Sequence, residues 1–151
     1  MKDNSKIELT SFVDYTKKVA IRTRPFLLSV LDHFGDRIEM KTKFYSTSPS
    51  NSEFVISSKA ALAAELQGRM DDMHELLIHY KETFTEDAVF TLAESIDLDM
   101  ERFREDFESE YVSVRLEEDK SHAKERDVNF APSLTINGYM YKDAWDEEAL
   151  M

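Results

Sequence analysis

The side chains best suited to bind a charged ligand form a short basic cluster near the N-terminus. Lys17, Lys18, Arg22 and Arg24 follow one another without an intervening Asp or Glu. A helix that begins near Thr16 would place both lysines over the positive end of its dipole, where a like charge is unfavourable. An anion held by the free N–H groups and the lysines would relieve this cost. The ligand would be a carboxylate, a phosphate or an acidic segment of a partner, and the alternative is a solvated basic patch.

Other residue types that carry catalysis or bind metals are absent or poorly spaced. The chain has no cysteine, which excludes thiol–disulfide exchange by this chain and thiolate metal sites within it. His74 and His79 are five positions apart and diverge on a helix, so they do not form the i, i+4 pair of a zinc site. We expect His74 to lie in the core. The acidic runs 101–110 and 117–119 lack calcium-loop spacing. We therefore predict neither a metal nor a cofactor.

Composition narrows the class of protein further. The chain has 151 residues, of which 42% are apolar, as expected of one globular domain. A net charge of −12 disfavours nucleic acids and anionic membranes as partners. The first ten residues lack the apolar region of a secretory signal, and no apolar run approaches the ~18 residues of a membrane span. We therefore expect a cytoplasmic location.

Two segments near the N-terminus have the patterns of strands. Residues 7–13 are apolar on both sides towards their end, which favours a central strand. Residues 37–44 alternate between charged residues, among them two lysines, and a face that is apolar except for Thr42, as in an edge strand. A helix should lie between them, kinked at Pro25 and ended by Gly35. The crossover predicts that the two strands are parallel.

The remainder of the chain predicts helices and then a hairpin. Helices are expected over 54–67 and 112–126, with two further apolar stripes between them. Thr85 and Asp99 are the candidate N-caps of the intervening helices. Asn137-Gly138 is a strong signal for a two-residue hairpin turn between strands 134–136 and 139–141. Trp145 and Leu150 would belong to a last short helix. The order of elements indicates an α/β protein.

This order, together with local motifs, resembles the DsbA-like branch of the thioredoxin superfamily. The stretches that carry the likeness are, in order, Phe12–Tyr15, His33–Ile38, Gln67–Leu77, Leu98–Phe103 and Ala131–Gly138. The resemblance implies a thioredoxin-like core with a four-stranded mixed sheet, built from residues 1–45 and 127–151. It also implies a helical insertion over residues 53–126, within a single domain of residues 1–151.

The departure from the family pattern concerns its chemical centre. The family carries Cys-x-x-Cys at the start of the first helix, and these positions fall on Lys17 and Ala20, in the stretch Lys17-Lys18-Val19-Ala20. The helix dipole that would favour a thiolate therefore has no thiol to act on. The resemblance also implies that the Ala131–Pro132 bond is cis and that this loop offers backbone hydrogen bonds to an extended peptide.

A redox-inactive binding module is the first function that these observations favour. Its groove would lie between the Lys17–Ala20 loop and the cis-Pro132 loop, and it would take a peptide, a small acidic ligand such as glutathione, or a partner protein. The candidate ligand-binding residues are Thr16, Lys17, Lys18, Val19, Ala20, Arg22, Ala131 and Pro132.

Two alternatives remain open. The first is a glutathione-dependent transferase resembling the kappa class, which needs a hydroxyl donor for the bound thiolate. Such enzymes would carry Ser where this chain has Lys17, and Thr16 is the nearest hydroxyl. The second is a structural or dimerisation domain with a vestigial groove. An exposed apolar patch that includes Phe54, Val55 and Phe84 would favour it.

Overall fold

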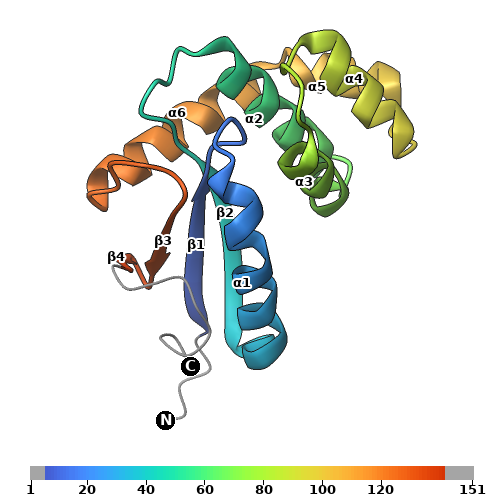
Figure 1. Cartoon of the computed structure of the whole chain (residues 1–151). Coiled ribbons are helices and arrows are strands. Elements are labelled where there is room, and N and C mark those ends of the chain that lie inside the picture. The colour runs from blue at the N-terminus through green and yellow to red at the C-terminus, as the bar shows by residue number, and fades with distance from the viewer. Residues whose placement is uncertain (1–5, 142–151) are drawn as a thin grey trace.

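A four-stranded mixed sheet forms the base of the fold (Figure 1). The computed structural model describes residues 6–141, with the backbone alone for residues 19–22. β1 (Ile7–Val13) pairs in parallel with β2 (Ile38–Phe44), and β3 (Ser133–Ile136) and β4 (Tyr139–Met140) continue the sheet in antiparallel fashion. The order β2-β1-β3-β4 confirms that the first strand is central and that the second is an edge strand.

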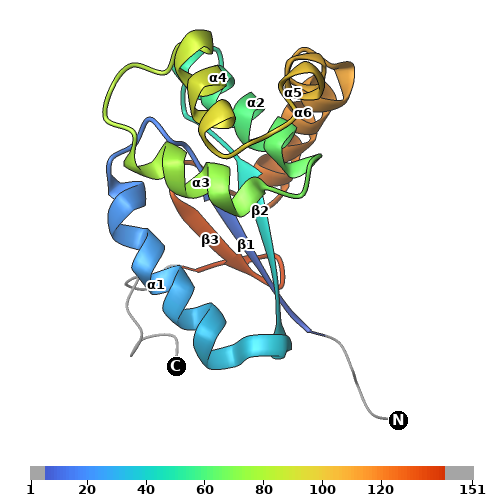
Figure 2. The same cartoon turned by 90° about the vertical axis from the view of Figure 1, so that its right-hand side faces the viewer.

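Helix α1 (Val19–Phe34) covers one face of the sheet (Figure 2). Phe26, Leu27 and Val30 pack against Leu9 of β1 and Leu134 of β3. Pro25 lies inside the helix, which is followed by Gly35 at a φ of 54°, a conformation that glycine adopts without strain. A short 3₁₀ helix, η1 (Gly35–Arg37), leads into β2.

The start of α1 differs from the prediction. The helix begins at Val19 rather than near Thr16. The reason is local, because the buried carboxylate of Asp14 accepts hydrogen bonds from both the amide and the hydroxyl of Thr16. These bonds favour a turn at the end of β1 over a helical first turn.

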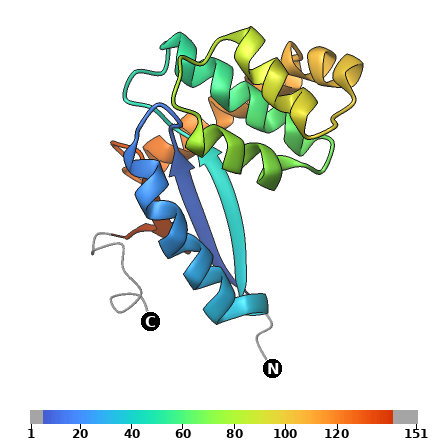
Figure 3. The same ribbon diagram turned by 45° about the vertical axis from the view of Figure 1, so that its right-hand side comes forward.

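Five helices gather at the end of the sheet where β1 and β2 terminate (Figure 3). They are α2 (Ser52–Glu65), α3 (Met70–His79), α4 (Glu86–Ser95), α5 (Met100–Phe107) and α6 (Glu110–Glu125). α2 is the central helix of this group and contacts the other four. Its residues 60–64 are all fully buried. No helix among residues 6–141 is long and apolar enough to cross a bilayer.

Local hydrogen bonds confirm the predicted caps and hairpin. Thr85 accepts from the Ala88 amide to cap α4, and Asp99 accepts from the Arg102 amide to cap α5. The hairpin turns at Asn137 and Gly138, both with positive φ. The predicted last helix with Trp145 and Leu150 lies outside the described residues.

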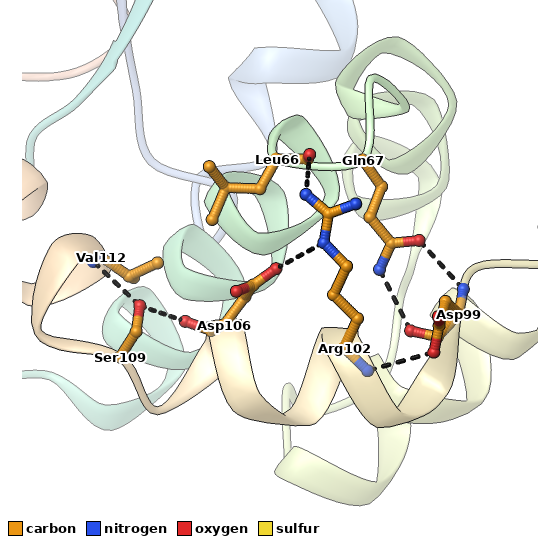
Figure 4. A network of polar contacts seen from close by, with 7 residues as sticks. All are labelled: Leu66, Gln67, Asp99, Arg102, Asp106, Ser109 and Val112. Atoms are coloured by element: carbon orange, nitrogen blue, oxygen red, sulfur yellow. Dashed lines mark hydrogen bonds and ion pairs between the residues drawn. The ribbon is translucent and has the colours of Figure 1, made fainter.

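A polar network joins the end of α2 to the start of α5 (Figure 4). The side-chain amide of Gln67 donates to the Asp99 carbonyl at 3.1 Å, and its carbonyl accepts from the Asp99 amide at 2.9 Å. Arg102 donates to the Leu66 carbonyl at 2.7 Å and forms an ion pair with Asp106. The network gives hydrogen-bond partners to the Leu66 carbonyl at the end of α2 and to the Asp99 amide at the start of α5.

Candidate functional site

The turn between β1 and α1 holds the basic residues in a defined position. Asp14 is 1% exposed, and its Oδ1 lies 2.9 Å from the Thr16 amide and 2.7 Å from the Thr16 hydroxyl. The Lys17 amide donates to the Asp14 carbonyl at 3.0 Å. Lys17 and Lys18 are exposed at the surface of this turn. The buried aspartate therefore anchors the segment from which both lysines project.

A cavity of about 390 Å³ opens beside this turn. We call it the lysine pocket, because Lys17 and Lys18 line it together with Lys81 from the loop between α3 and α4. The aromatic side chains in its lining are Tyr15, Tyr80 and Phe84. Its remaining lining residues are Thr16, Glu53, Ile78 and Glu82. The pocket thus combines cationic groups with aromatic surface, a lining suited to an anionic ligand that also has apolar parts.

Among the described residues, the lysines of the lysine pocket have no carboxylate within ion-pair distance, whereas one of the pocket's carboxylates has a hydrogen-bond partner. None of its lysines has a carboxylate within 4 Å among the residues that the structure describes, whereas Lys41 and Lys59 elsewhere each have one. Glu53 is held by the Phe84 amide, which donates to Oε1 at 2.9 Å. The pocket therefore presents unpaired cations in a chain of net charge −12.

Tyr15 connects the lysine pocket to the core beneath it. Its hydroxyl forms a hydrogen bond with Nδ1 of His74 at 2.5 Å, and both side chains are buried. The pKa of His74 is lowered to about 4, chiefly by burial and in part by the nearby Arg24, with Glu75 acting in the opposite direction. Burial likewise raises the pKa of Tyr15 above its usual range. His74 is therefore neutral near pH 7, and its expected place in the core is confirmed.

The structure brings together only part of the predicted set. Thr16, Lys17 and Lys18 line the lysine pocket. Val19 and Ala20 form the start of α1 and Arg22 lies in the same helix, with side chains outside the described part.

The Ala131–Pro132 bond is cis, and Pro132 lines a separate cavity of only about 10 Å³. His74 lines this second cavity and contacts Tyr15 of the first.

Sequence reasoning missed the aromatic and basic residues that complete the lysine pocket. Tyr80, Lys81 and Phe84 lie between two predicted helices and have no periodicity of their own. The one sequence feature that could have drawn attention to this segment is the pair Tyr80-Lys81, an aromatic residue next to a basic one. No pattern in the neighbouring sequence connects this pair with position 17. The apolar patch considered for Phe54, Val55 and Phe84 is not exposed, because Phe54 and Phe84 are buried and Val55 is half-buried.

Metal-binding geometry is not found in the described part of the chain. Within residues 6–141 no group of three or more His, Asp or Glu side chains is arranged to hold a metal ion. The groups of the lysine pocket that can act on a ligand are its lysines, the carboxylates of Glu53 and Glu82, its aromatic rings and the Thr16 hydroxyl.

Comparisons with known proteins identify relatives over most of the chain. The thioredoxin family profile (Thioredoxin_5, described as "Thioredoxin") matches residues 6–149. The Na(+)/H(+) antiporter NhaA 1 of Mycolicibacterium gilvum is 26% identical over 151 residues, which cover 98% of this chain and 24% of that protein. The ClpXP adapter protein SpxH of Bacillus subtilis is 33% identical over 107 residues, which cover 66% of this chain and 36% of that protein. The chain thus spans about a quarter to a third of the length of these relatives.

A solved structure shows the same fold. The thiol-disulfide exchange protein alpha-DsbA2 from Wolbachia pipientis superposes with a TM-score of 0.82 at 15% identity, covering 99% of this chain and 80% of that one. The predicted α/β fold, with its four-stranded mixed sheet and DsbA-like arrangement, is confirmed.

Proposed function

Because the chain belongs to the thioredoxin family and has no cysteine, we propose that it is a redox-inactive binding module whose lysine pocket holds an acidic peptide segment of a partner protein. Thiol exchange proceeds through a mixed disulfide, which this chain has no thiol to form. In this proposal residues 53–126 are an insertion into a core of residues 1–45 and 127–151, and the protein works in the cytoplasm.

The observation that carries the proposal is the set of unpaired lysines around a partly aromatic cavity. Lys17, Lys18 and Lys81 come from two segments far apart in the sequence, yet they line one pocket. Carboxylates of a ligand would find complementary charge there, and Tyr80 and Phe84 would contact its apolar parts. The pocket lies at the ends of the parallel strands, where α/β folds commonly bind ligands.

One relative supports a role in protein binding. The name of the Bacillus subtilis protein describes an adapter, which is a protein that acts by binding others. Ion transport by the antiporter relatives is not part of the proposal, because the chain matches only about a quarter of the first of them.

The transferase alternative has less support. It needs a hydroxyl that donates a hydrogen bond to the bound thiolate, and Thr16 is the hydroxyl in the lysine pocket. The Thr16 hydroxyl already donates to Asp14 at 2.7 Å. The Thr16 hydroxyl has one proton, and a bound thiolate would have to compete with the Asp14 carboxylate for it. This competition counts against a glutathione-activating role.

The test is binding of a fluorescently labelled hexaglutamate peptide, measured by anisotropy at two salt concentrations. The Lys17→Ala, Lys18→Ala double variant is expected to weaken binding about 2- to 30-fold, since an exposed ion pair contributes roughly 0.2–1 kcal/mol. The matched control is Lys6→Ala, Lys124→Ala, which removes two exposed lysines outside the lysine pocket.

Two results would contradict the proposal. One is equal loss of affinity in both double variants, which would indicate nonspecific attraction. The other is tight, salt-insensitive binding, because surface charge attraction must weaken as salt is raised.

A further inference from the structure

A further cavity, which shares no lining residue with the lysine pocket, lies between the end of β2, the start of α2 and one side of α6. We call it the α2–α6 pocket. Its volume is about 230 Å³, and the lining residues that matter for its chemistry are Phe44, Ser46, Phe54, Val55, Leu116 and Lys120. Pockets for drug-sized ligands are larger, roughly 300–1,000 Å³. The α2–α6 pocket therefore fits a small molecule, such as one with a single ring or a short chain.

The inner wall of this pocket is apolar and belongs to the core. Phe44 is 1% exposed and Phe54 is 5% exposed, and both are members of the large core cluster of the helical group. Val55 and Leu116 are partly buried and pack against the same cluster. An apolar group placed against these side chains would be removed from water on contact with rigid, well-packed walls.

A buried hydroxyl adds a directional polar contact. Ser46 is 5% exposed, and its Oγ accepts a hydrogen bond from the Ser48 amide at 3.0 Å. No group within residues 6–141 accepts the proton of this hydroxyl. The Ser46 hydroxyl is therefore a buried donor without an acceptor. An oxygen of a ligand that accepts this proton would add a hydrogen bond and so contribute to the binding free energy.

The charged residues at the pocket favour an anion. Lys120 is exposed and forms no ion pair within the described part of the chain, although Glu117 also lines the pocket. Lys59 lines it too, with its ammonium group 4.5 Å from the Phe107 ring centre and 3.9 Å from Glu108. Because Glu108 already compensates Lys59, the cation of the lining that remains for an anionic ligand is the exposed Lys120.

We propose that the α2–α6 pocket binds a small apolar carboxylate, with its ring or chain against Phe44, Phe54 and Leu116. The carboxylate accepts the Ser46 hydroxyl proton and lies near Lys120. This site is independent of the lysine pocket and of the function proposed for it.

The probe for this site is 3-phenylpropionate, compared with 3-phenylpropan-1-ol and 3-phenylpropylamine. Binding is followed by ¹H–¹⁵N chemical-shift changes across the whole chain. The acid is expected to shift the amides of Ser46, Val55 and Leu116 in a saturable way and to bind at least about tenfold more tightly than the amine. The alcohol, which keeps the ring and an acceptor but lacks the charge, should bind with intermediate affinity.

Variants separate the charge from the cavity. Lys120→Gln should weaken the acid about 2- to 5-fold and leave the alcohol unchanged, because one exposed charge contributes up to roughly 1 kcal/mol. Lys124→Gln, on the same helix but outside the pocket lining, is the matched control and should change neither. Val55→Phe, which fills the cavity, should abolish binding of both, with its spectrum reporting whether it remains folded.

Three outcomes would overturn the proposal. They are shifts that centre on Lys17 and Lys81 instead of Ser46, equal affinity for the acid and the amine, and unchanged acid binding in a folded Val55→Phe protein.

Discussion

Acid should destabilise this protein through His74, and the size of the effect follows from the burial of that residue. The pKa of His74 is lowered from 6.5 to about 4 by burial in the first place, with Arg24 lowering it and Glu75 raising it. Its ring also contacts Tyr15, whose hydroxyl shares a hydrogen bond with Nδ1. In the unfolded chain the imidazole would protonate near its ordinary pKa.

The direction and the size of this change in unfolding free energy follow from proton linkage. Between pH 6.5 and pH 4 the unfolded chain binds a proton at His74 that the folded protein does not, so stability falls as the pH is lowered through this window. The loss is complete near the folded-state pKa. A difference from 6.5 to about 4 corresponds to about 3 kcal/mol of unfolding free energy between pH 7 and pH 4.

The assay is urea unfolding of the wild type and of His74→Gln at a series of pH values. His74→Gln loses some stability at pH 7, but it lacks the imidazole, so its unfolding free energy should fall by about 3 kcal/mol less than that of the wild type between pH 7 and pH 4. His33→Gln removes an exposed histidine and serves as the control, expected to follow the wild type. Parallel pH profiles for the wild type and His74→Gln, or an NMR titration of His74 near pH 6.5, would refute the reasoning.

Two further substitutions test the contacts that hold the helical group together. Gln67→Ala removes both hydrogen bonds to the backbone of Asp99 (Figure 4). The free energy of unfolding measured in urea should fall by about 1–2 kcal/mol. An unchanged midpoint would show that water replaces these bonds. Arg115→Ala leaves Asp119, which is 1% exposed, without its ion-pair partner and should cost about 3 kcal/mol. The control is Arg126→Ala, which breaks an ion pair with Glu125, a side chain that is 67% exposed, and should lower the free energy of unfolding by less than about 1 kcal/mol. Equal losses for Arg115→Ala and Arg126→Ala would contradict the argument from burial.

Features of the fold that depend on neighbouring residues could be predicted from the sequence. The alternation in residues 37–44 indicated an edge strand, and the side chains of Thr85 and Asp99 indicated two helix starts. Asn137-Gly138 likewise indicated the hairpin, because a tight turn with positive φ restricts the residues that it accepts.

Features that depend on distant contacts could not be predicted in this way. The start of α1 was misplaced because a buried carboxylate at position 14 competes for the groups that a first helical turn would use. Several residues that line the pocket together with Lys17 come from the loop after α3. No periodic pattern in the sequence relates position 17 to position 81. Whether Phe54 and Phe84 form an exposed apolar patch could not be decided from the sequence, and both are buried in the packed helical group.

The central position of α2 has a consequence for how this fold diverges among relatives. Residues 60–64 span more than one helical turn, and all are fully buried, so this stretch of α2 has no side that faces solvent. Four of the five are alanines, and the neighbouring helices approach closely because those side chains are small. A bulkier residue here requires a compensating reduction in a facing helix. In an alignment of relatives, these positions should therefore change together with residues of α3 to α6, and seldom alone.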